Sequence, residues 1–406
     1  MSATRTDYRN PYRPRLVRWI NRAAQRFGAD KSPRFTAAAL VQAAIRAEGL
    51  QDFGPPSLDP LGELLPAIEE EARLSPVGRW ITFGRLVAVL KNRLRAAHAW
   101  QNEHSLRPVR APIVITGLQR TGTTFLHRLL AADPALRALR SWEALAPVPP
   151  RGVDRRIVQA QAAEQGLRWM APDFFAVHPV EALAPEEDVL LLDQSLLSTV
   201  PEATLRVPSY AAWLERQDHH PAYETLRRLL MLLSGDDDRR WILKTPHHLE
   251  WLDVLLDVFP DAVIVMTHRD PTTTLASFCS MIAHGRGVMS DHVDPHEIGA
   301  EWLRKVGRMM DRAMEVRAAR PGARVLDVDY REIIGDPGGT LARIRAFAGH
   351  EPDPAADAAV EAVIRTQTKD RHGTHRYDLA DFGLSEALVA DRFPAYRERF
   401  ALGGPR

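Results

Sequence analysis

From residue 113 onward, short runs of apolar residues alternate with longer stretches of helical periodicity. The runs lie at residues 113–116, 241–243, 262–267 and 323–328, and apolar positions at three- and four-residue spacing occur between them. Buried strands joined by helical connections are typical of a parallel sheet whose two faces are covered by helices. The pattern therefore predicts an α/β fold with a central parallel sheet.

The segment before the first predicted strand has helical patterning only. Residues 34–105 place apolar side chains at helical spacing, and prolines at positions 55, 56, 60, 66 and 76 divide the pattern into pieces. We expect a helical subdomain over residues 1–105 and an α/β domain over residues 106–406. A proline-rich helical insertion at about 145–235 is expected to cover the site and shape a pocket.

The first predicted strand leads through a glycine turn into a helix. The turn has the sequence Gly117-Leu118-Gln119-Arg120-Thr121-Gly122-Thr123-Thr124. Such a turn directs backbone N–H groups and a helix N-terminus at one point, which favours an oxyanion of phosphate or sulfate type. The turn resembles a nucleotide-binding P-loop, but Thr123 replaces the usual lysine, and the cation comes earlier, at Arg120. ATP is therefore a poor first hypothesis.

A second candidate anion site follows the predicted strand at 262–267. Arg269 comes directly after this strand, and Ser277 lies eight residues later in the next predicted helix. An arginine and a hydroxyl so placed can face one another across the turn and bind an anion. Two anion sites at the carboxyl ends of neighbouring parallel strands suit a ligand with two separated phosphate-like groups, such as a bisphosphorylated nucleotide.

Together the two elements resemble the cofactor signatures of sulfotransferases that use 3′-phosphoadenosine 5′-phosphosulfate. The resemblance is to a bacterial branch with arginine in the 5′-phosphosulfate loop, as in the tyrosylprotein sulfotransferases, and it runs from about residue 51 to residue 400. It implies a P-loop-like three-layer fold and transfer of the sulfuryl group to a hydroxyl of a small-molecule, lipid or glycan acceptor. No metal is expected to be required.

The resemblance also implies which residues bind the nucleotide. Tyr330 is similar to a family tyrosine near the adenine, although a core-facing role is an open alternative, and Lys369 belongs to a basic segment that could close over the 3′-phosphate. The cofactor-binding residues expected are Gln119, Arg120, Thr121, Gly122, Thr123, Thr124, Arg269, Ser277, Tyr330 and Lys369.

Three residues are candidates for the chemistry. Arg120 would neutralise charge on the leaving phosphate. Glu143, which lies 23 residues after Arg120, resembles the glutamate base of the arginine-type branch, with a plain salt bridge to Arg120 as the alternative. His178 is the competing base, because an imidazole has the better intrinsic pKa. We rank Glu143 ahead of His178.

Charge and cysteine content narrow the function classes. The 53 lysines and arginines nearly balance 52 acidic residues, so a global basic field for nucleic acid is absent from the sequence. The one cysteine, Cys279, excludes an intrachain disulfide and fits a reducing compartment. The sequence has no stretch as long as a membrane span, and a cytoplasmic protein is expected.

The first 34 residues are unusually basic, with nine arginines and lysines against two aspartates. Leu16, Trp19, Ile20, Ala23 and Phe27 follow helical spacing, and arginines occupy the opposite face. Two interpretations stay open. The apolar face docks on the protein's own body, or it lies on an anionic membrane.

Two other functions remain as alternatives to a sulfotransferase. A small-molecule or nucleotide kinase would need Mg²⁺ and an acidic metal ligand, for which Asp327 and Asp329 are the candidates, but its loop lysine is missing. A nucleotide-binding scaffold would bind adenosine bisphosphate without transferring a group.

Overall fold

A five-stranded parallel sheet forms the centre of the computed structural model, which describes residues 7–26, 32–101, 106–366 and 377–402. The strand order is β2-β3-β1-β4-β5, and every neighbouring pair is parallel. The strands are β1 (Ile113–Gly117), β2 (Leu136–Ala138), β3 (Arg240–Lys244), β4 (Val263–His268) and β5 (Val325–Asp329). The predicted α/β fold with a parallel sheet is confirmed.

Alternate strand residues enter different hydrophobic clusters because successive side chains of a strand point to opposite faces. In β1, Ile113 and Ile115 pack on one face, and Val114 packs on the other. In β4, Val263 and Val265 join Ile113, while Ile264 joins Val114. Both faces of the sheet are therefore apolar, as a three-layer fold requires.

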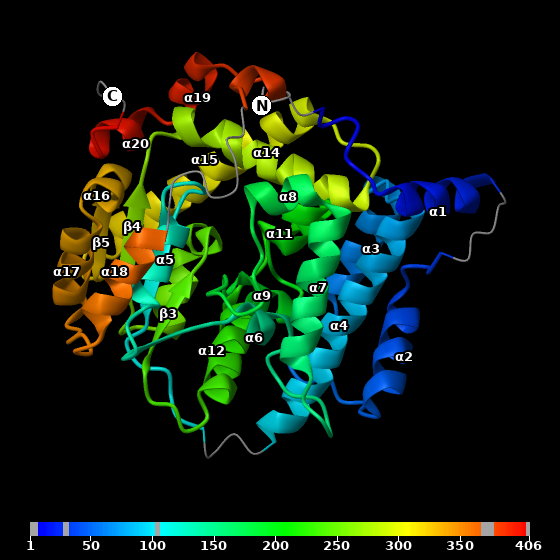
Figure 1. The fold of residues 1–406 in the computed structure, drawn as a ribbon, viewed down its shortest axis with the longest axis horizontal. Helices are drawn as coiled ribbons and strands as arrows, with labels where there is room; N and C mark the ends of the chain where they lie inside the picture. Colours follow the sequence, from blue (N-terminus) through cyan, green and yellow to red (C-terminus); the bar gives the residue numbers. More distant parts are fainter. Residues whose placement is uncertain (1–6, 27–31, 102–105, 367–376, 403–406) are drawn as a thin grey trace.

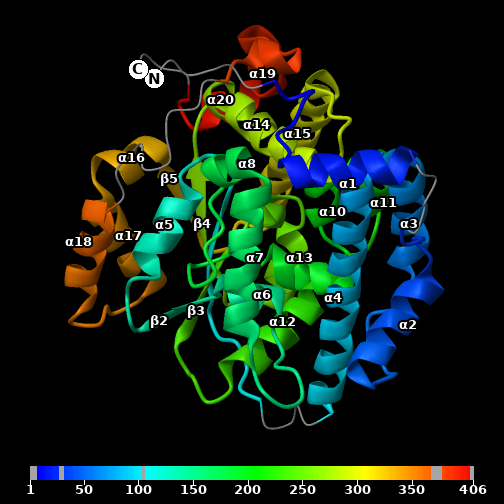
Figure 2. The same cartoon turned by 45° about the vertical axis from the view of Figure 1, so that its right-hand side comes forward.

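Helices cover both faces (Figures 1 and 2). On one face lie α5 (Thr123–Leu130), α17 (Pro337–Ala348) and α18 (Ala356–Thr366), preceded by α16 (Tyr330–Gly335). On the other face lie α12 (His220–Ser234), α13 (Leu252–Val258), α14 (Pro271–Met289) and α15 (Pro295–Ala319). The chain continues through α19 (Glu386–Arg392) and α20 (Pro394–Arg399), which pack beside α14 and α15.

Four helices precede the sheet: α1 (Arg15–Arg26), α2 (Ala37–Glu48), α3 (Pro60–Glu71) and α4 (Pro76–Trp100). The helices α2, α3 and α4 pack into the core that α12 and α13 share with the sheet, and α1 packs against α4. Buried Leu40, Leu64 and Leu90 belong to the same cluster as Val114 of the sheet. The N-terminal helices thus extend one layer of the molecule, as the blue segment in Figure 1 shows.

The segment between β2 and β3 consists of helices joined by loops, in agreement with the predicted helical insertion. Its helices are α6 (Ser141–Leu145), α7 (Arg156–Met170), α8 (Pro172–Val177), α9 (Val189–Leu192), α10 (Val200–Thr204), α11 (Pro208–Leu214) and α12. The strand β2 was not predicted, because a three-residue edge strand of sequence Leu-Arg-Ala has too short a pattern to recognise. Within the described part of the chain, no helix combines the length and apolar character needed to cross a bilayer.

A buried ion cluster ties α15 to the insertion. The Lys305 ammonium, which is 1% exposed, lies 3.1 Å from Glu202 of α10, 2.9 Å from Glu250 and 3.3 Å from Glu215. Burial alone would lower the pKa of Lys305, but the three carboxylates outweigh it and raise the pKa. The ammonium therefore stays charged and joins three segments.

Replacing Lys305 with methionine should destabilise the protein by about 3–5 kcal/mol, because the buried carboxylates lose their shared cation. The matched control is Arg304→Met, since Arg304 pairs with Glu215 from a side chain that is 54% exposed. That change should cost less than about 1 kcal/mol. Urea denaturation of both variants measures the difference, and equal small shifts would contradict the role of the cluster.

Candidate functional site

The predicted glycine turn lies at the carboxyl end of β1, the middle strand, between the ends of β3 and β4. Thr121 donates its hydroxyl hydrogen bond to the Leu118 carbonyl at 2.6 Å, and its Oγ1 lies 2.6 Å from Oγ1 of Thr267 in β4. These contacts fasten the turn to the neighbouring strand. Thr121 therefore shapes the turn from a fully buried position.

Two positions of the turn require glycine. A Cβ on Gly117 would lie 2.3 Å from Oγ1 of Thr267, and a Cβ on Gly122 would lie 3.1 Å from the Tyr330 ring, at a φ of +88°. Arg120 has a φ of 70°, a strained conformation for a residue with a side chain. Such strain is retained where the surroundings enforce it, often at functional sites.

The turn opens into a pocket that we call the loop pocket. Gly122 is the N-cap of α5 and gives no side-chain cap, so the first N–H groups of the helix are left for a ligand. The pocket holds about 790 Å³, counted out to its open mouth. Its lining residues are Gln119, Arg120, Gly122, Thr123, Thr124, Phe125, His178, Glu187, Pro246, Arg269, Met281, Tyr330 and Ile334.

Arg269 points toward the glycine turn. Its Nη1 donates a hydrogen bond to the Arg120 carbonyl at 3.0 Å, and its guanidinium lies 3.9 Å from the centre of the Tyr330 ring. The structure thus brings together three residues that were predicted from distant parts of the sequence. Two guanidinium groups at one pocket, with an aromatic ring beside them, suit a doubly charged nucleotide.

Other predicted nucleotide contacts stand apart from this lining. Ser277 is 2% exposed in α14 and does not line the loop pocket, but its hydroxyl has no hydrogen-bond partner among the described residues. An unpartnered buried hydroxyl is a donor available to a ligand. Lys369 lies outside the described residues.

A second and larger space adjoins the loop pocket; we call it the apolar cavity. It holds about 1260 Å³, and its wall is formed mainly by α8, α9, α10, α14 and α15. Apolar lining residues include Leu145, Phe174, Val180, Val189, Leu190, Val200, Phe278, Ile282, Trp302 and Met309. Such a cavity favours an apolar ligand.

The two spaces meet at one junction. Gln119, His178, Glu187, Pro246 and Met281 line both of them. A group bound in the apolar cavity can therefore approach a group bound at the glycine turn. This continuity is the geometry that a transfer between two substrates needs.

Charged groups surround the half-buried His178 at this junction. Burial lowers the pKa of His178, as do Lys244 and Arg120, and the carboxylates of Glu186 and Glu187 oppose that effect without overcoming it. Glu187 is itself held by the buried Lys244, whose Nζ lies 2.6 Å away. His178 is therefore neutral at neutral pH, a state in which a ring nitrogen can accept a proton.

Sequence reasoning missed the pair formed by Glu187 and Lys244. The signals were an acidic triplet, which ends at Asp188, and a lysine at the end of a strand. Lys244 also donates its backbone N–H to Asp188 at 2.7 Å. Neither signal alone indicates that the chain folds these residues against each other.

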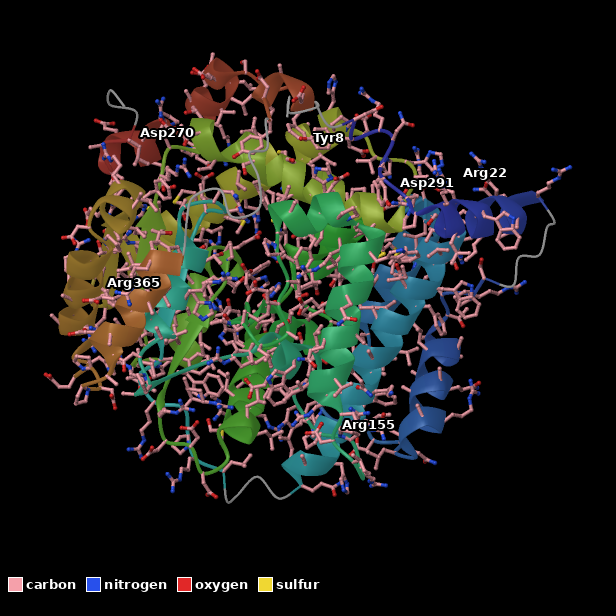
Figure 3. The ribbon with its side chains drawn as sticks, in the orientation of Figure 1. Tyr8, Arg22, Arg155, Asp270, Asp291 and Arg365 are labelled. Carbon is pink, nitrogen blue, oxygen red and sulfur yellow. The ribbon has the colours of Figure 1, made fainter. Side chains whose placement is uncertain are left out.

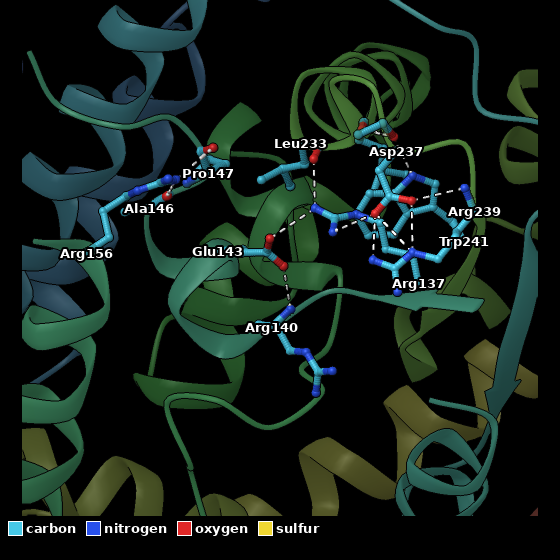
Figure 4. Close-up of polar contacts among 12 residues, drawn as sticks. Arg137, Arg140, Glu143, Ala146, Pro147, Arg156, Leu233, Asp237, Arg239 and Trp241 are labelled. Atoms are coloured by element: carbon cyan, nitrogen blue, oxygen red, sulfur yellow. Dashed lines mark hydrogen bonds and ion pairs between the residues drawn. The ribbon is translucent and has the colours of Figure 1, made fainter. Parts of the chain in front are cut away.

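Glu143 has a different environment from the one predicted for a base (Figure 4). One carboxylate oxygen accepts a hydrogen bond from Arg137 at 3.0 Å, and the other accepts the Arg140 backbone N–H at 2.9 Å. Ser141 and Leu145 of the same helix, α6, line the apolar cavity. Glu143 lines neither the apolar cavity nor the loop pocket. The alternative role expected for Glu143 was a salt bridge to Arg120. In the structure, its salt-bridge partner is Arg137 instead.

The proposed metal ligands of a kinase are also engaged elsewhere. Asp327 accepts two hydrogen bonds from Arg317, at 2.7 and 2.8 Å, and lies 2.8 Å from His268. Asp329 caps the first turn of α16 and pairs with Arg331. Burial raises the pKa of Asp327, but its hydrogen bonds to His268 and Arg317 lower it to about 2. Both carboxylates thus have structural partners.

Known proteins share both sequence and fold with this chain. A model of the sulfotransferase family matches residues 112–354. Omega-hydroxy-beta-dihydromenaquinone-9 sulfotransferase Stf3 of Mycobacterium bovis is 27% identical over an alignment of 264 residues that covers 59% of this chain. The match spans 62% of that relative, a little under two thirds of its length.

Two crystal structures superpose over most of the chain. Sulfotransferase STF1 from Mycobacterium tuberculosis H37Rv has a TM-score of 0.78 and is 36% identical, over 90% of this chain and 100% of that one. Sulfotransferase STF9 from Mycobacterium avium has a TM-score of 0.83 and is 25% identical, over 92% and 98% respectively. The family model matches more than half of the length of this chain, and the chain therefore belongs to the sulfotransferase family.

Proposed function

We propose that this protein transfers the sulfuryl group of 3′-phosphoadenosine 5′-phosphosulfate to a hydroxyl of an apolar small molecule or lipid. The observation that carries the proposal is the continuity of the loop pocket with the apolar cavity at His178. A charged donor and an apolar acceptor need adjoining sites of opposite character. Cys279, a buried free thiol, fits a cytoplasmic site of action.

The residues of the loop pocket fit such a donor, which supplies a sulfuryl group on a phosphate leaving group. The N-terminus of α5, Thr123 and Thr124 would hold its 5′ end, and Arg120 would neutralise charge that develops on the leaving phosphate. Arg269 would bind the 3′-phosphate. The hydroxyl of Ser277, which has no partner among the described residues, would add a further donor from the first two turns of α14.

We propose His178 as the base that takes the proton of the acceptor hydroxyl. It lines both spaces and is neutral at neutral pH, whereas Glu143 lines neither and holds two hydrogen bonds. Glu187, which lines both spaces and is held by the Lys244 ammonium at 2.6 Å, acts as a positioning residue at this junction. This ordering reverses the preference for Glu143 that the sequence indicated.

The acceptor is proposed to be an alcohol on a long apolar framework. The name of the relative Stf3 describes an omega-hydroxylated dihydromenaquinone as its substrate. The large apolar cavity supports an acceptor of that general kind, with its hydroxyl directed toward His178. Sulfur-labelled donor and a panel of isoprenoid and fatty alcohols should yield labelled sulfate esters, with or without EDTA. Phosphorylated products from Mg-ATP would contradict the proposal.

Replacing Arg269 with alanine should weaken binding of adenosine 3′,5′-bisphosphate by at least about tenfold, because a charge-assisted hydrogen bond contributes about 1.5–3 kcal/mol. The control is Arg128→Ala in α5, since Arg128 pairs with Glu181 and does not line the loop pocket. Calorimetric titration measures both affinities. Unchanged affinity in the Arg269 variant would refute its role.

Replacing His178 with glutamine should lower turnover at least about 100-fold while leaving nucleotide affinity nearly unchanged. In the wild type, kcat/KM should be flat above pH 7 and decline only on the acid side of 6.5, because the base is active when neutral and its pKa is lowered. Glu143→Gln should retain the acid limb. A His178 variant with the same pH profile as the wild type would exclude it as the base.

A further inference from the structure

Helix α1 docks on the protein through one narrow face. Val17 and Asn21 are its buried residues, and the Asn21 side-chain oxygen accepts the Val77 backbone N–H at 3.0 Å. Arg13, four residues before Val17, donates to the Ser290 carbonyl at 2.9 Å and lies 3.1 Å from Asp291. These contacts anchor the helix along the stripe formed by positions 13, 17 and 21.

The apolar face predicted from the sequence is a different one, and it is open to solvent. Leu16 is 56% exposed, Trp19 is 67% exposed and Ile20 is 39% exposed. At 100° per residue, Leu16 and Trp19 point about 100° and 160° away from Val17 at the centre of the docked stripe, and Ile20 lies at the edge of the apolar face nearest that stripe, about 60° from Val17. The sequence left two interpretations of this face open. The first, that the face docks on the protein's own body, is wrong for Leu16, Trp19 and Ile20, because all three are exposed.

Arginines occupy the remaining arc of the helix. Arg15, Arg18, Arg22 and Arg26 are exposed, and none forms an ion pair with a residue in the described ranges. Figure 3 shows Arg22 on α1 at the edge of the molecule. The helix thus has three faces, with the apolar face lying between the docked face and the basic face.

We propose that this apolar face, together with the four arginines, is a docking surface for an anionic lipid bilayer. Tryptophan and aliphatic side chains enter the boundary between headgroups and acyl chains, while arginines beside them bind lipid phosphates. These arginines have no ion-pair partner within the described residues, and positive charge beside an exposed apolar face favours an anionic membrane over a second, equally basic copy of this helix. Trp80 of α4, 57% exposed, lies one turn beyond the Val77 contact and adds a further exposed ring.

Membrane docking would serve the acceptor site, a consequence that rests on the proposed function. The Tyr8 hydroxyl donates a hydrogen bond to the Ser280 hydroxyl at 2.9 Å, so the segment leading into α1 packs on α14. The neighbouring Met281 and Ile282 of α14 line the apolar cavity. The docking surface and the acceptor cavity are therefore attached to the same helix.

Sedimentation of the full chain with sucrose-loaded vesicles tests the surface directly. Vesicles of equal parts phosphatidylcholine and phosphatidylglycerol should bind the wild type at least about tenfold better than phosphatidylcholine alone, and high salt should reduce this preference. The double variant Leu16→Ala/Trp19→Ala should bind the mixed vesicles at least about tenfold more weakly. Arg15→Gln/Arg18→Gln should weaken binding to the mixed vesicles only.

The matched control is Leu388→Ala/Trp169→Ala, which removes a leucine 48% exposed and a tryptophan 53% exposed on other helices. It should bind vesicles as the wild type does. All variants should retain affinity for adenosine 3′,5′-bisphosphate, so that loss of the membrane surface is distinguished from failure of the proposed function. Vesicle binding unchanged by Leu16→Ala/Trp19→Ala, or self-association that this variant abolishes, would overturn the proposal.

Discussion

The close contact between the glycine turn and β4 is the constraint on which the rest of the site depends. Thr121 and Thr267 touch through their hydroxyls, and only glycine at position 117 leaves room for that approach. The contact sets the N-terminus of α5, with its partial positive charge, beside the end of β4. Since Arg269 follows that strand directly, one backbone arrangement determines where two sources of positive potential lie.

The helical insertion adds what the sheet does not supply. It provides His178 and Glu187 at the junction and much of the wall of the apolar cavity. Its position is held by charge as well as by apolar packing, because Lys305 joins α15 to α10 and Lys244 joins β3 to Glu187. The same framework therefore combines a charged pocket with an apolar cavity.

The sequence was most informative where local pattern and position in the fold are coupled. The glycine turn, the four longer strands and Arg269 follow from short motifs at strand ends, which the fold brings to one edge of the sheet. It was least informative about the orientation of side chains on short or surface helices. Glu143 is the third residue of the five-residue helix α6, and its carboxylate turns back to cap the Arg140 backbone N–H and to pair with Arg137.

The exposed face of α1 illustrates the same limit. Helical spacing identified Leu16 and Trp19 as one apolar face, but spacing alone does not say whether protein covers it. Asn21 makes the docking contact instead, and a polar residue gives no such signal in a hydrophobic pattern. Similarly, Glu187 and Lys244 are far apart in sequence, so only the folded chain reveals their pairing.

A crystal structure of the protein with adenosine 3′,5′-bisphosphate tests the central claim most directly. The account predicts the 5′-phosphate at the N-terminus of α5, within hydrogen-bond distance of Thr123 or Thr124, and the 3′-phosphate on the Arg269 guanidinium. A nucleotide bound away from the glycine turn, or one whose 3′-phosphate leaves Arg269 bonded only to the Arg120 carbonyl, would contradict it.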